Sequence, residues 1–198
     1  MSSHALLSAS SSKRWLNCPP SARLCAEIED TTSEYAKEGT DAHTLCEYKV
    51  KTMLGIEMQD PTETLVYYNE EMERCANDYA CYIMDGLEVI KNYCKDPLVL
   101  IEQKLDFSRY VPEGFGTGDC VIVADKTLYI FDFKYGKGVE VESENNPQMM
   151  CYAVGALELF DSLYDIENVC MIIFQPRIEN ISVSNMNVTE LYNWAENT

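Results

Sequence analysis

The sequence predicts an α/β fold with a mixed central β-sheet, flanked by helices and preceded by a helical N-terminal region. Apolar residues recur at spacings of three and four through much of residues 1–96, which is the period of an amphipathic helix. After Asp96-Pro97 this period gives way to short runs rich in β-branched and aromatic residues. We expect one domain over residues 1–198, with a helical part at 1–96 and a sheet-containing part at 97–198.

The helical part is expected to begin with two short pieces. Residues 8–27 open with serines that can cap a helix, but the Pro19-Pro20 pair must break or restart it. An apolar stripe predicts the next helix over residues 33–54, ended by the glycine that follows. The clearest periodicity in the chain predicts a long helix over residues 67–95.

The second part is expected to contain five strands and a crossover helix. The strands are predicted at residues 98–105, 116–123, 127–133, 169–175 and 178–188. Only a few residues join the second strand to the third, which favours an antiparallel hairpin. Pro147 should open a helix that runs to about residue 164, and a last helix begins at residues 189–194. The strand after the crossover helix is a candidate parallel partner for an earlier one.

Composition limits the class of protein. The chain is 46% hydrophobic and 24% charged, which is ordinary for a globular protein, and it has no apolar run of about 18 residues that could span a membrane. The N-terminal residues lack the basic start and apolar core of a signal peptide, so we expect a cytoplasmic location. The nine cysteines form no regular framework and no CxxC pair, which favours reduced thiols over disulfides and argues against a self-contained zinc site.

The formal net charge of -18 argues against an ordinary nucleic-acid-binding protein, because phosphate binding usually depends on Lys and Arg. A site built from carboxylates and divalent cations is an exception, since the bound cations invert the local charge. The few basic residues are also partly clustered, with Lys13, Arg14 and Arg23 near the start and Lys134 and Lys137 together. Solubility alone explains most of the charge.

Two acids and a lysine interrupt the apolar strands in the second half. Asp132 and Lys134 are two apart on one predicted strand and share a face, while Asp119 lies on the neighbouring hairpin strand. Carboxylates with backbone and water oxygens suit Mg²⁺, and a lysine beside them could orient water and offset charge on a phosphodiester. Each residue alone has an ordinary explanation as a turn or strand-end residue, but together they favour a hydrolytic metal site.

Further residues are candidates for the same site. Glu102 interrupts another apolar strand, either as an extra ligand or as an edge-strand residue facing water. His43 and Glu47 share a helix face, and an imidazole would add tolerance for Mn²⁺, although a lone helical histidine is more often structural. Gln148 and Tyr152 also share a helix face, where they could contact DNA, support Lys134 or simply pack in the core. The glycines around Lys137 lack the spacing of a nucleotide-binding loop.

In this order the motifs resemble the RecB-like branch of the PD-(D/E)xK nuclease superfamily. The resemblance is greatest to an uncharacterised phage- and prophage-encoded group related to the nuclease domains of AddB and of the CRISPR-associated RecB-like exonucleases. It covers most of the chain: a Ser-rich, Cys-Pro segment over residues 8–24, a helical histidine motif over 39–47, a GxxD-type strand at Gly118-Asp119, a DxK strand at 132–134 and a QxxxY helix at 148–152.

This resemblance implies a restriction-endonuclease-like core and roles for individual residues. His43, Asp119, Asp132 and the Phe133 carbonyl would bind Mg²⁺ or Mn²⁺, with Glu102 and Glu47 as further candidates. Lys134, Asp119 and Asp132 would be catalytic, and Gln148 and Tyr152 would contact DNA or support the lysine. Many relatives hold an iron-sulfur cluster with one N-terminal and three C-terminal cysteines. Cys18 matches the first, but the C-terminal group is absent, so we expect no such cluster in this chain.

The leading hypothesis is therefore a Mg²⁺- or Mn²⁺-dependent deoxyribonuclease. It would be an exonuclease acting on single strands or DNA ends, alongside phage recombination or replication proteins in a bacterial host, and it could form oligomers. Two alternatives stay open: a weak or inactive nuclease-fold module for binding DNA or protein, and an acidic DNA mimic that inhibits a host factor.

Overall fold

A five-stranded mixed sheet forms the centre of the protein, as the sequence predicts. The structure is a computed structural model that describes residues 5–27 and 33–198; residues 1–4, on which the expectation of no signal peptide partly depends, lie outside them. The strand order follows the chain, with β3 and β4 parallel and the other pairs antiparallel. The strands are β1 (Leu98–Asp106), β2 (Phe115–Ala124), β3 (Thr127–Phe133), β4 (Asn168–Gln175) and β5 (Asn180–Asn187).

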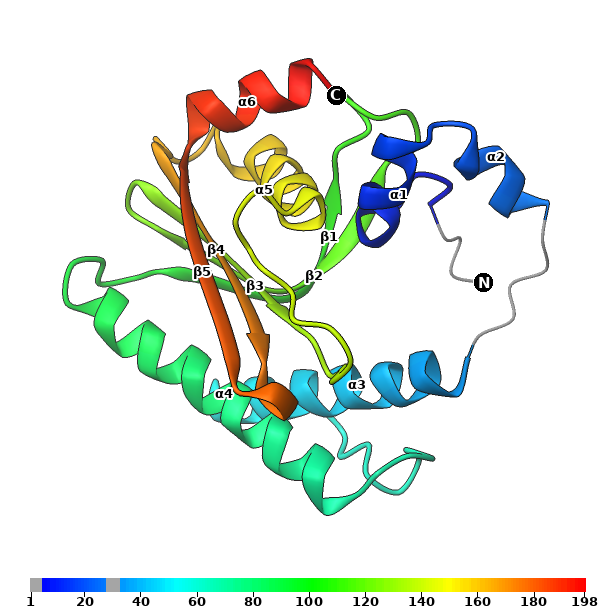
Figure 1. Ribbon diagram of the computed structural model, residues 1–198. Coiled ribbons are helices and arrows are strands. Elements are labelled where there is room, and N and C mark those ends of the chain that lie inside the picture. The colour runs from blue at the N-terminus through cyan, green and yellow to red at the C-terminus, as the bar shows by residue number, and fades with distance from the viewer. Residues whose placement is uncertain (1–4, 28–32) are drawn as a thin grey trace.

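One face of the sheet is covered by the crossover helix α5 (Pro147–Phe160), which links the parallel strands β3 and β4 (Figure 1). Asn146 caps this helix by accepting a hydrogen bond from the Gln148 N–H at 3.0 Å, and Pro147 occupies its first turn. Four shorter segments lie on the same side: η1 (Ala9–Ser11), α1 (Ser12–Asn17), α2 (Ser21–Ala26) and α6 (Val188–Glu196).

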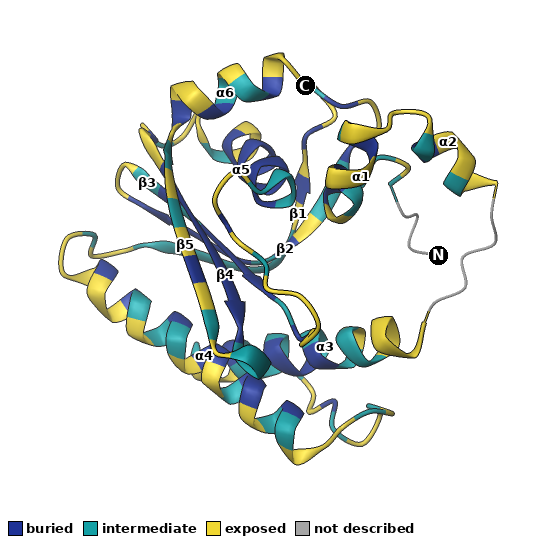
Figure 2. Cartoon of the chain, in the orientation of Figure 1, coloured by how far each residue is buried: buried dark blue, intermediate teal, exposed yellow. Residues whose placement is uncertain are grey.

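Two long helices, α3 (Glu34–Met53) and α4 (Glu70–Lys91), cover the opposite face of the sheet (Figure 1). Their outward sides are exposed and their inward sides buried, as Figure 2 shows, which is the amphipathic pattern expected from their periodicity. Ser33 caps α3 by accepting a hydrogen bond from the Ala36 N–H.

The sheet separates two hydrophobic cores. The α5-side core contains buried side chains of α5, the N-terminal segments and α6, and the α4-side core contains those of α3 and α4. Both cores include alternating residues of β2 and β3, because successive side chains of a strand point to opposite faces. Strands β3 and β4 are thus buried on both sides, which is why their sequences read as nearly continuous apolar runs (Figure 2).

Several predicted boundaries were wrong by a few residues. Helix α4 begins at residue 70 instead of 67, because Asn69 caps it by accepting from the Met72 N–H at 2.9 Å. Helix α5 ends at residue 160 instead of 164, because its last carbonyl accepts from the N–H groups of Leu163 and Tyr164 in a turn. Strand β5 begins at residue 180, since Glu179 before it has a left-handed backbone.

All nine cysteines are free, in agreement with the prediction of reduced thiols. Within residues 5–27 and 33–198, no helix combines the length and apolar character needed to cross a bilayer.

Candidate metal centre

The site forms where the regular pairing of the sheet is interrupted. Glu102 in β1 and Asp119 in β2 stand at opposing positions, but the backbone pairing skips them. The flanking pairs are Ile101 with Cys120 and Gln103 with Gly118. Glu102 has φ 53°, a left-handed conformation that is unfavourable for a side-chain-bearing residue in a strand.

This interruption changes the face to which side chains of both strands point. Leu100 and Leu105 pack into the same α5-side core although they are five positions apart, a spacing that regular alternation would put on opposite faces. In β2, a Cβ at Gly118 would lie 2.8 Å from Leu105 and 3.4 Å from Val121, again on that side. In both strands the alternation of side chains between the two faces therefore reverses near Glu102 and Asp119. Regular alternation no longer determines to which face these two side chains point.

Asp119 also lies where β2 separates from β3. The pairing between these strands ends at Cys120 and Phe131, while β3 stays paired with β4 through Phe133. The Phe133 N–H that would otherwise face β2 donates to Asp119 Oδ2 at 2.6 Å. A carboxylate thus occupies the gap between the strands and is fixed by the backbone of the DxK segment.

Helix α3, on the face of the sheet opposite α5, brings His43 to the Asp119 carboxylate. His43 Nδ1 lies 3.1 Å from Asp119 Oδ1, and the imidazole packs edge-on against the Phe133 ring with centroids 5.5 Å apart. The His43 side chain is 35% exposed and that of Asp119 is 11% exposed, so solvent reaches His43 while Asp119 is nearly buried beneath it.

His43, Glu102 and Asp119 form a group suited to a metal ion. Each offers one ligand atom, and these atoms all lie within 4.8 Å of one another. One imidazole nitrogen and two carboxylates are a common donor set for Mn²⁺ and related cations. The structure thus brings together His43 and Asp119, both expected as ligands, with Glu102, for which a solvent-facing role was the open alternative.

A second group lies on the α5 side of the gap. Lys134 Nζ is 3.0 Å from Asp132 Oδ2 and donates to Gln148 Oε1 at 3.1 Å. The Gln148 amide donates to Asp132 Oδ1 and to the Tyr152 hydroxyl, both at 3.0 Å. Gln148 therefore holds the acid and the lysine together, and Tyr152 is positioned to hold Gln148.

The unused hydrogen-bonding capacity of Asp132 supports a cation in this position. Its side chain is only 3% exposed, yet Oδ2 makes no hydrogen bond among the described residues and has only the ion pair with Lys134. A buried carboxylate oxygen without a hydrogen bond is uncommon in proteins. Oδ2 therefore has room for a metal ion as a partner besides Lys134.

The acids in the site repel one another in the absence of a cation. Burial and then the Asp119 carboxylate raise the pKa of Glu102 to about 7. Burial raises the pKa of Asp132 above its ordinary value, with Lys134 opposing that shift and Asp119 reinforcing it. A divalent cation would relieve this repulsion, because it favours the ionised form of every carboxylate near it.

His43 and Asp119 stabilise each other's charged forms. Burial lowers the pKa of His43, but the Asp119 carboxylate outweighs that effect and raises it to about 9. Burial raises the pKa of Asp119, whereas His43 and the Phe133 N–H bring it below its ordinary value. Without a metal, a proton on His43 thus takes the place that a cation would occupy.

The other predicted site residues lie at different distances from this centre. Glu47, one turn after His43, pairs with Lys51, and its charge contributes to the raised pKa of Glu102. The Phe133 carbonyl follows Asp132 directly in the chain. Cys18 is exposed at the end of α1, where its N–H donates to the Arg14 carbonyl.

An ion-pair group beside the site was not predicted. Arg177, after β4, binds Glu71 of α4 at 2.7 Å and Glu38 of α3 at 3.5 Å, and its guanidinium lies 4.3 Å from the Tyr135 ring centroid. Its side chain is 8% exposed. It connects the helices to the segment that follows Lys134. The feature of the sequence that could have indicated this group is an arginine just after a buried strand that was a candidate parallel partner of an earlier strand.

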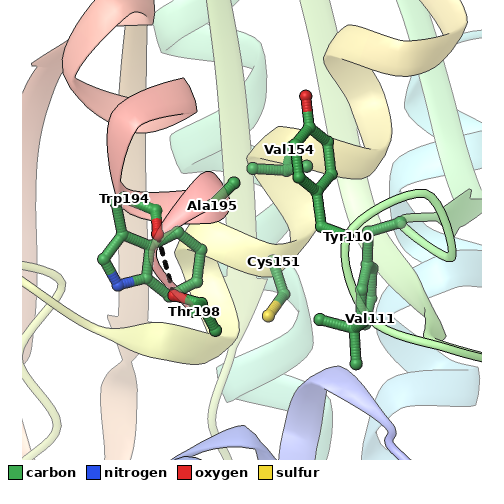
Figure 3. Close-up of a pocket in the computed structure, with 8 residues that line it drawn as sticks. Tyr110, Val111, Cys151, Val154, Trp194, Ala195 and Thr198 are labelled. Carbon is green, nitrogen blue, oxygen red and sulfur yellow. Dashed lines mark hydrogen bonds between the residues drawn. The ribbon is translucent and has the colours of Figure 1, made fainter.

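The pocket between α5, α6 and the β1–β2 connection is not a second chemical site. Its walls are mainly apolar, with Val111, Val154 and Ala195 among them, and the Thr198 hydroxyl donates to the Trp194 carbonyl at its edge (Figure 3). Its volume is about 10 Å³, room for no more than one water molecule.

Comparisons with known proteins give a family and matches among solved structures, one of which is described below. The sequence model of a family described as "Protein of unknown function (DUF2800)" matches residues 4–198. A solved structure titled "Crystal structure of SSO0001" shares 15% identity over 77% of this chain and 83% of that chain, with a TM-score of 0.25. A likeness at this TM-score supports no argument about this chain.

Proposed function

We propose that this chain, which belongs to the DUF2800 family of proteins of unknown function, is a metal-dependent nuclease of the RecB-like PD-(D/E)xK type. It would hydrolyse phosphodiester bonds in DNA with Mg²⁺ or Mn²⁺, as an exonuclease acting on single strands or ends. The setting we propose is the cytoplasm of a bacterial host, in phage recombination or replication.

The observation that supports this proposal is the meeting of two groups at one gap in the sheet. The His43, Glu102 and Asp119 ligands come from α3, β1 and β2, and Asp119 is hydrogen-bonded to the backbone between Asp132 and Lys134. Residues far apart in sequence thus bring carboxylate oxygens, one imidazole nitrogen and a positive charge close together. Residues with a purely structural role would not need to meet in this way. Burying several acids together is unfavourable for folding, as the raised pKa values of Glu102 and Asp132 indicate.

The residues suit a division of labour in phosphodiester hydrolysis. His43, Glu102, Asp119, Asp132 and the Phe133 carbonyl would hold the metal, which would polarise the phosphodiester and lower the pKa of a bound water. Lys134 remains positively charged, because burial lowers its pKa but Asp132 raises it above the ordinary value. It can therefore orient water and offset negative charge that develops on the phosphate oxygens.

Gln148 keeps Lys134 in a usable position. It accepts from Lys134 and donates to Asp132, so the lysine is held by two oxygens instead of folding entirely onto the acid. Tyr152 is 5% exposed and supplies a firm support for Gln148. Such support matters because small displacements of a catalytic group cause large losses in rate.

A second candidate function is binding without catalysis, as a nuclease-fold module or an acidic mimic of DNA. The observation that favours it is the charge of -18, with many of the cations neutralised by ion pairs. Such a surface disfavours a long duplex lying across the protein.

The experiment that separates these functions is a cleavage assay. Labelled single-stranded and double-stranded DNA would be incubated with Mn²⁺, Mg²⁺ or EDTA and wild-type protein, Asp132→Ala or Lys134→Ala. Asp165→Ala and Lys95→Ala serve as matched controls, because they remove an acid and a lysine outside the site. We expect cleavage with either metal, none with EDTA, and loss in the two site variants alone. Metal-independent cleavage, cleavage that persists in both site variants, or none under any condition would exclude the catalytic proposal.

A further inference from the structure

The positive charge of this acidic protein is distributed unevenly. Residues 1–26 contain three Lys or Arg residues and no Asp or Glu, whereas residues 27–198 contain the other twelve and all 33 acids. The first segment therefore has a formal charge of +3 and the rest has -21. A polyanion that approaches the protein meets an attractive field at the N-terminal segment and repulsion over most of the remaining surface.

The fold presents these three cations to solvent. Helix α1 buries Ser12 and Trp15 and exposes Lys13 and Arg14, and α2 buries Ala22 and exposes Arg23. None of the three cations forms an ion pair within residues 5–27 and 33–198, whereas Lys134 and Arg177 near the site are both paired with acids. Because unpaired cations release counterions when they bind phosphate, these three are suited to a nucleic-acid backbone.

The N-terminal segment is packed against the wall of the candidate site. A Cβ at Gly116 of β2 would lie 2.7 Å from the Tyr152 ring and 3.0 Å from Ala9 Cβ. Tyr152 accepts from Gln148, which contacts both Lys134 and Asp132. Ala9, in the same N-terminal segment as the free cations, therefore lies near Tyr152, whose partner Gln148 contacts the catalytic pair. Figure 1 shows α1 beside the ends of β1 and β2, with α2 farther from the sheet.

A groove lies between this layer and the β1–β2 connection. Its volume is about 370 Å³, and Trp15, Leu16, Pro19, Arg23 and Tyr110 contribute to its lining. Arg23 places a cation on a largely apolar surface that includes the partly exposed ring of Tyr110. Proteins that bind single strands combine these features, because bases pack on apolar and aromatic surface while phosphates contact cations.

We infer that α1, α2 and this groove bind the backbone and bases of a single-stranded polynucleotide and guide it to the metal centre. This inference rests on the proposed function, because it names the surface that would bind the single-stranded substrate of the proposed nuclease. Duplex DNA fits less well, because the surrounding surface of -21 would face its second strand. Glu113 also lines the groove and opposes binding of phosphate there.

The test measures binding separately from cleavage. Fluorescence anisotropy of labelled oligothymidine would be recorded over a range of salt concentrations in EDTA, where the proposed nuclease cannot act. The proteins would be wild type, the triple variant Lys13→Ala/Arg14→Ala/Arg23→Ala, and the control triple variant Lys91→Ala/Lys95→Ala/Lys126→Ala. The control removes the same charge from the end of α4, the α4–β1 connection and the β2–β3 turn, which lie on the left of Figure 1, whereas α1 and α2 lie on the right.

We expect the N-terminal triple variant to lower the slope of log affinity against log salt by about 2, since each phosphate contact on a single strand contributes about 0.7. Its affinity at low salt should fall at least about ten-fold. The control should stay within about two-fold, and Glu113→Gln should tighten binding. All six cations substituted in the two triple variants are exposed, and equal melting temperatures would show that folding is intact. If the triple variant melts earlier, the pair Lys13→Ala/Arg14→Ala replaces it.

The outcomes separate this inference from the proposed function. Equal salt slopes for both triple variants, or tighter binding of duplex than of single strands, would overturn the inference even if the protein cleaves DNA. Binding that depends on the N-terminal cations, in a protein that cleaves nothing with any metal, would support the surface and reject the nuclease.

Discussion

Asp119 accepts a hydrogen bond from the Phe133 N–H at 2.6 Å, across the gap where β2 separates from β3. In a continuous sheet this N–H would have a strand partner, so the carboxylate replaces a ladder hydrogen bond. The other oxygen of Asp119 meets His43 from α3 at 3.1 Å. A single side chain therefore connects α3, β2 and the DxK segment.

Replacing Gln148 by Leu should lower kcat by about 10- to 100-fold, with a smaller change in KM. The substitution keeps the side-chain volume but removes the acceptor for Lys134 and the donor to Asp132. Tyr152→Phe keeps the buried ring and loses only the hydroxyl that accepts from Gln148, so its effect should be under about ten-fold. Steady-state cleavage kinetics would measure both. An unchanged kcat in Gln148→Leu would show that Gln148 does not position the lysine.

Replacing Glu102 by Gly should stabilise the metal-free protein and weaken metal binding. Glycine adopts the left-handed backbone of residue 102 without strain, and the change removes an acid from the cluster. We expect a gain of about 0.5–1 kcal/mol, or roughly 1–4 °C in melting temperature. Glu113→Gly is the matched control, because Glu113 also has a positive φ of 57° but is exposed outside the cluster. It should give a similar backbone gain without any loss of Mn²⁺ affinity. A Glu102→Gly protein that binds Mn²⁺ as tightly as wild type would remove Glu102 from the ligand set.

Metal affinity should rise with pH. The metal-free protein holds a proton on Glu102 up to about pH 7 and on His43 up to about pH 9, and a cation must displace both. Both pKa values are raised, so binding releases protons below these values, and apparent affinity increases from about pH 6 until about pH 9. Calorimetric titration with Mn²⁺ in two buffers of different ionisation enthalpy would count the protons. Glu102→Gln should flatten the part near pH 7, and Asp165→Asn should change nothing. Affinity independent of pH over this range would contradict the site.

Two helical glycines should respond to alanine in opposite directions. A Cβ at Gly155 of α5 would lie 3.0 Å from the Leu105 backbone, so α5 would have to shift away from β1. We expect Gly155→Ala to destabilise the protein by about 1–3 kcal/mol. A Cβ at Gly86 of α4 meets nothing within 4 Å, so Gly86→Ala should stabilise it by about 0.5–1 kcal/mol. Chemical denaturation would measure both changes. Equal effects of the same sign would show that α5 does not pack this closely on β1.

Most of the fold could be predicted because its elements have clear local signals. The long helix α4 has an apolar stripe, and the β2–β3 hairpin has a very short connection. Boundaries were less predictable, since a cap such as Asn69 or a turn such as that after Phe160 depends on backbone geometry that competes with the apolar pattern. The motif residues Asp119, Asp132 and Lys134 could be identified because charges are unusual inside apolar strands.

The sequence by itself determined the order of the elements and the residues that could carry chemistry. Only the tertiary structure decided how they meet. Regular alternation would point Asp119 toward the α5 side with Val121, whereas His43 belongs to α3 on the other side. The interrupted pairing at Glu102 and the separation of β2 from β3 bring Asp119 and His43 together. Local periodicity cannot predict such long-range pairing, because the pairing depends on packing between segments that are far apart in the chain.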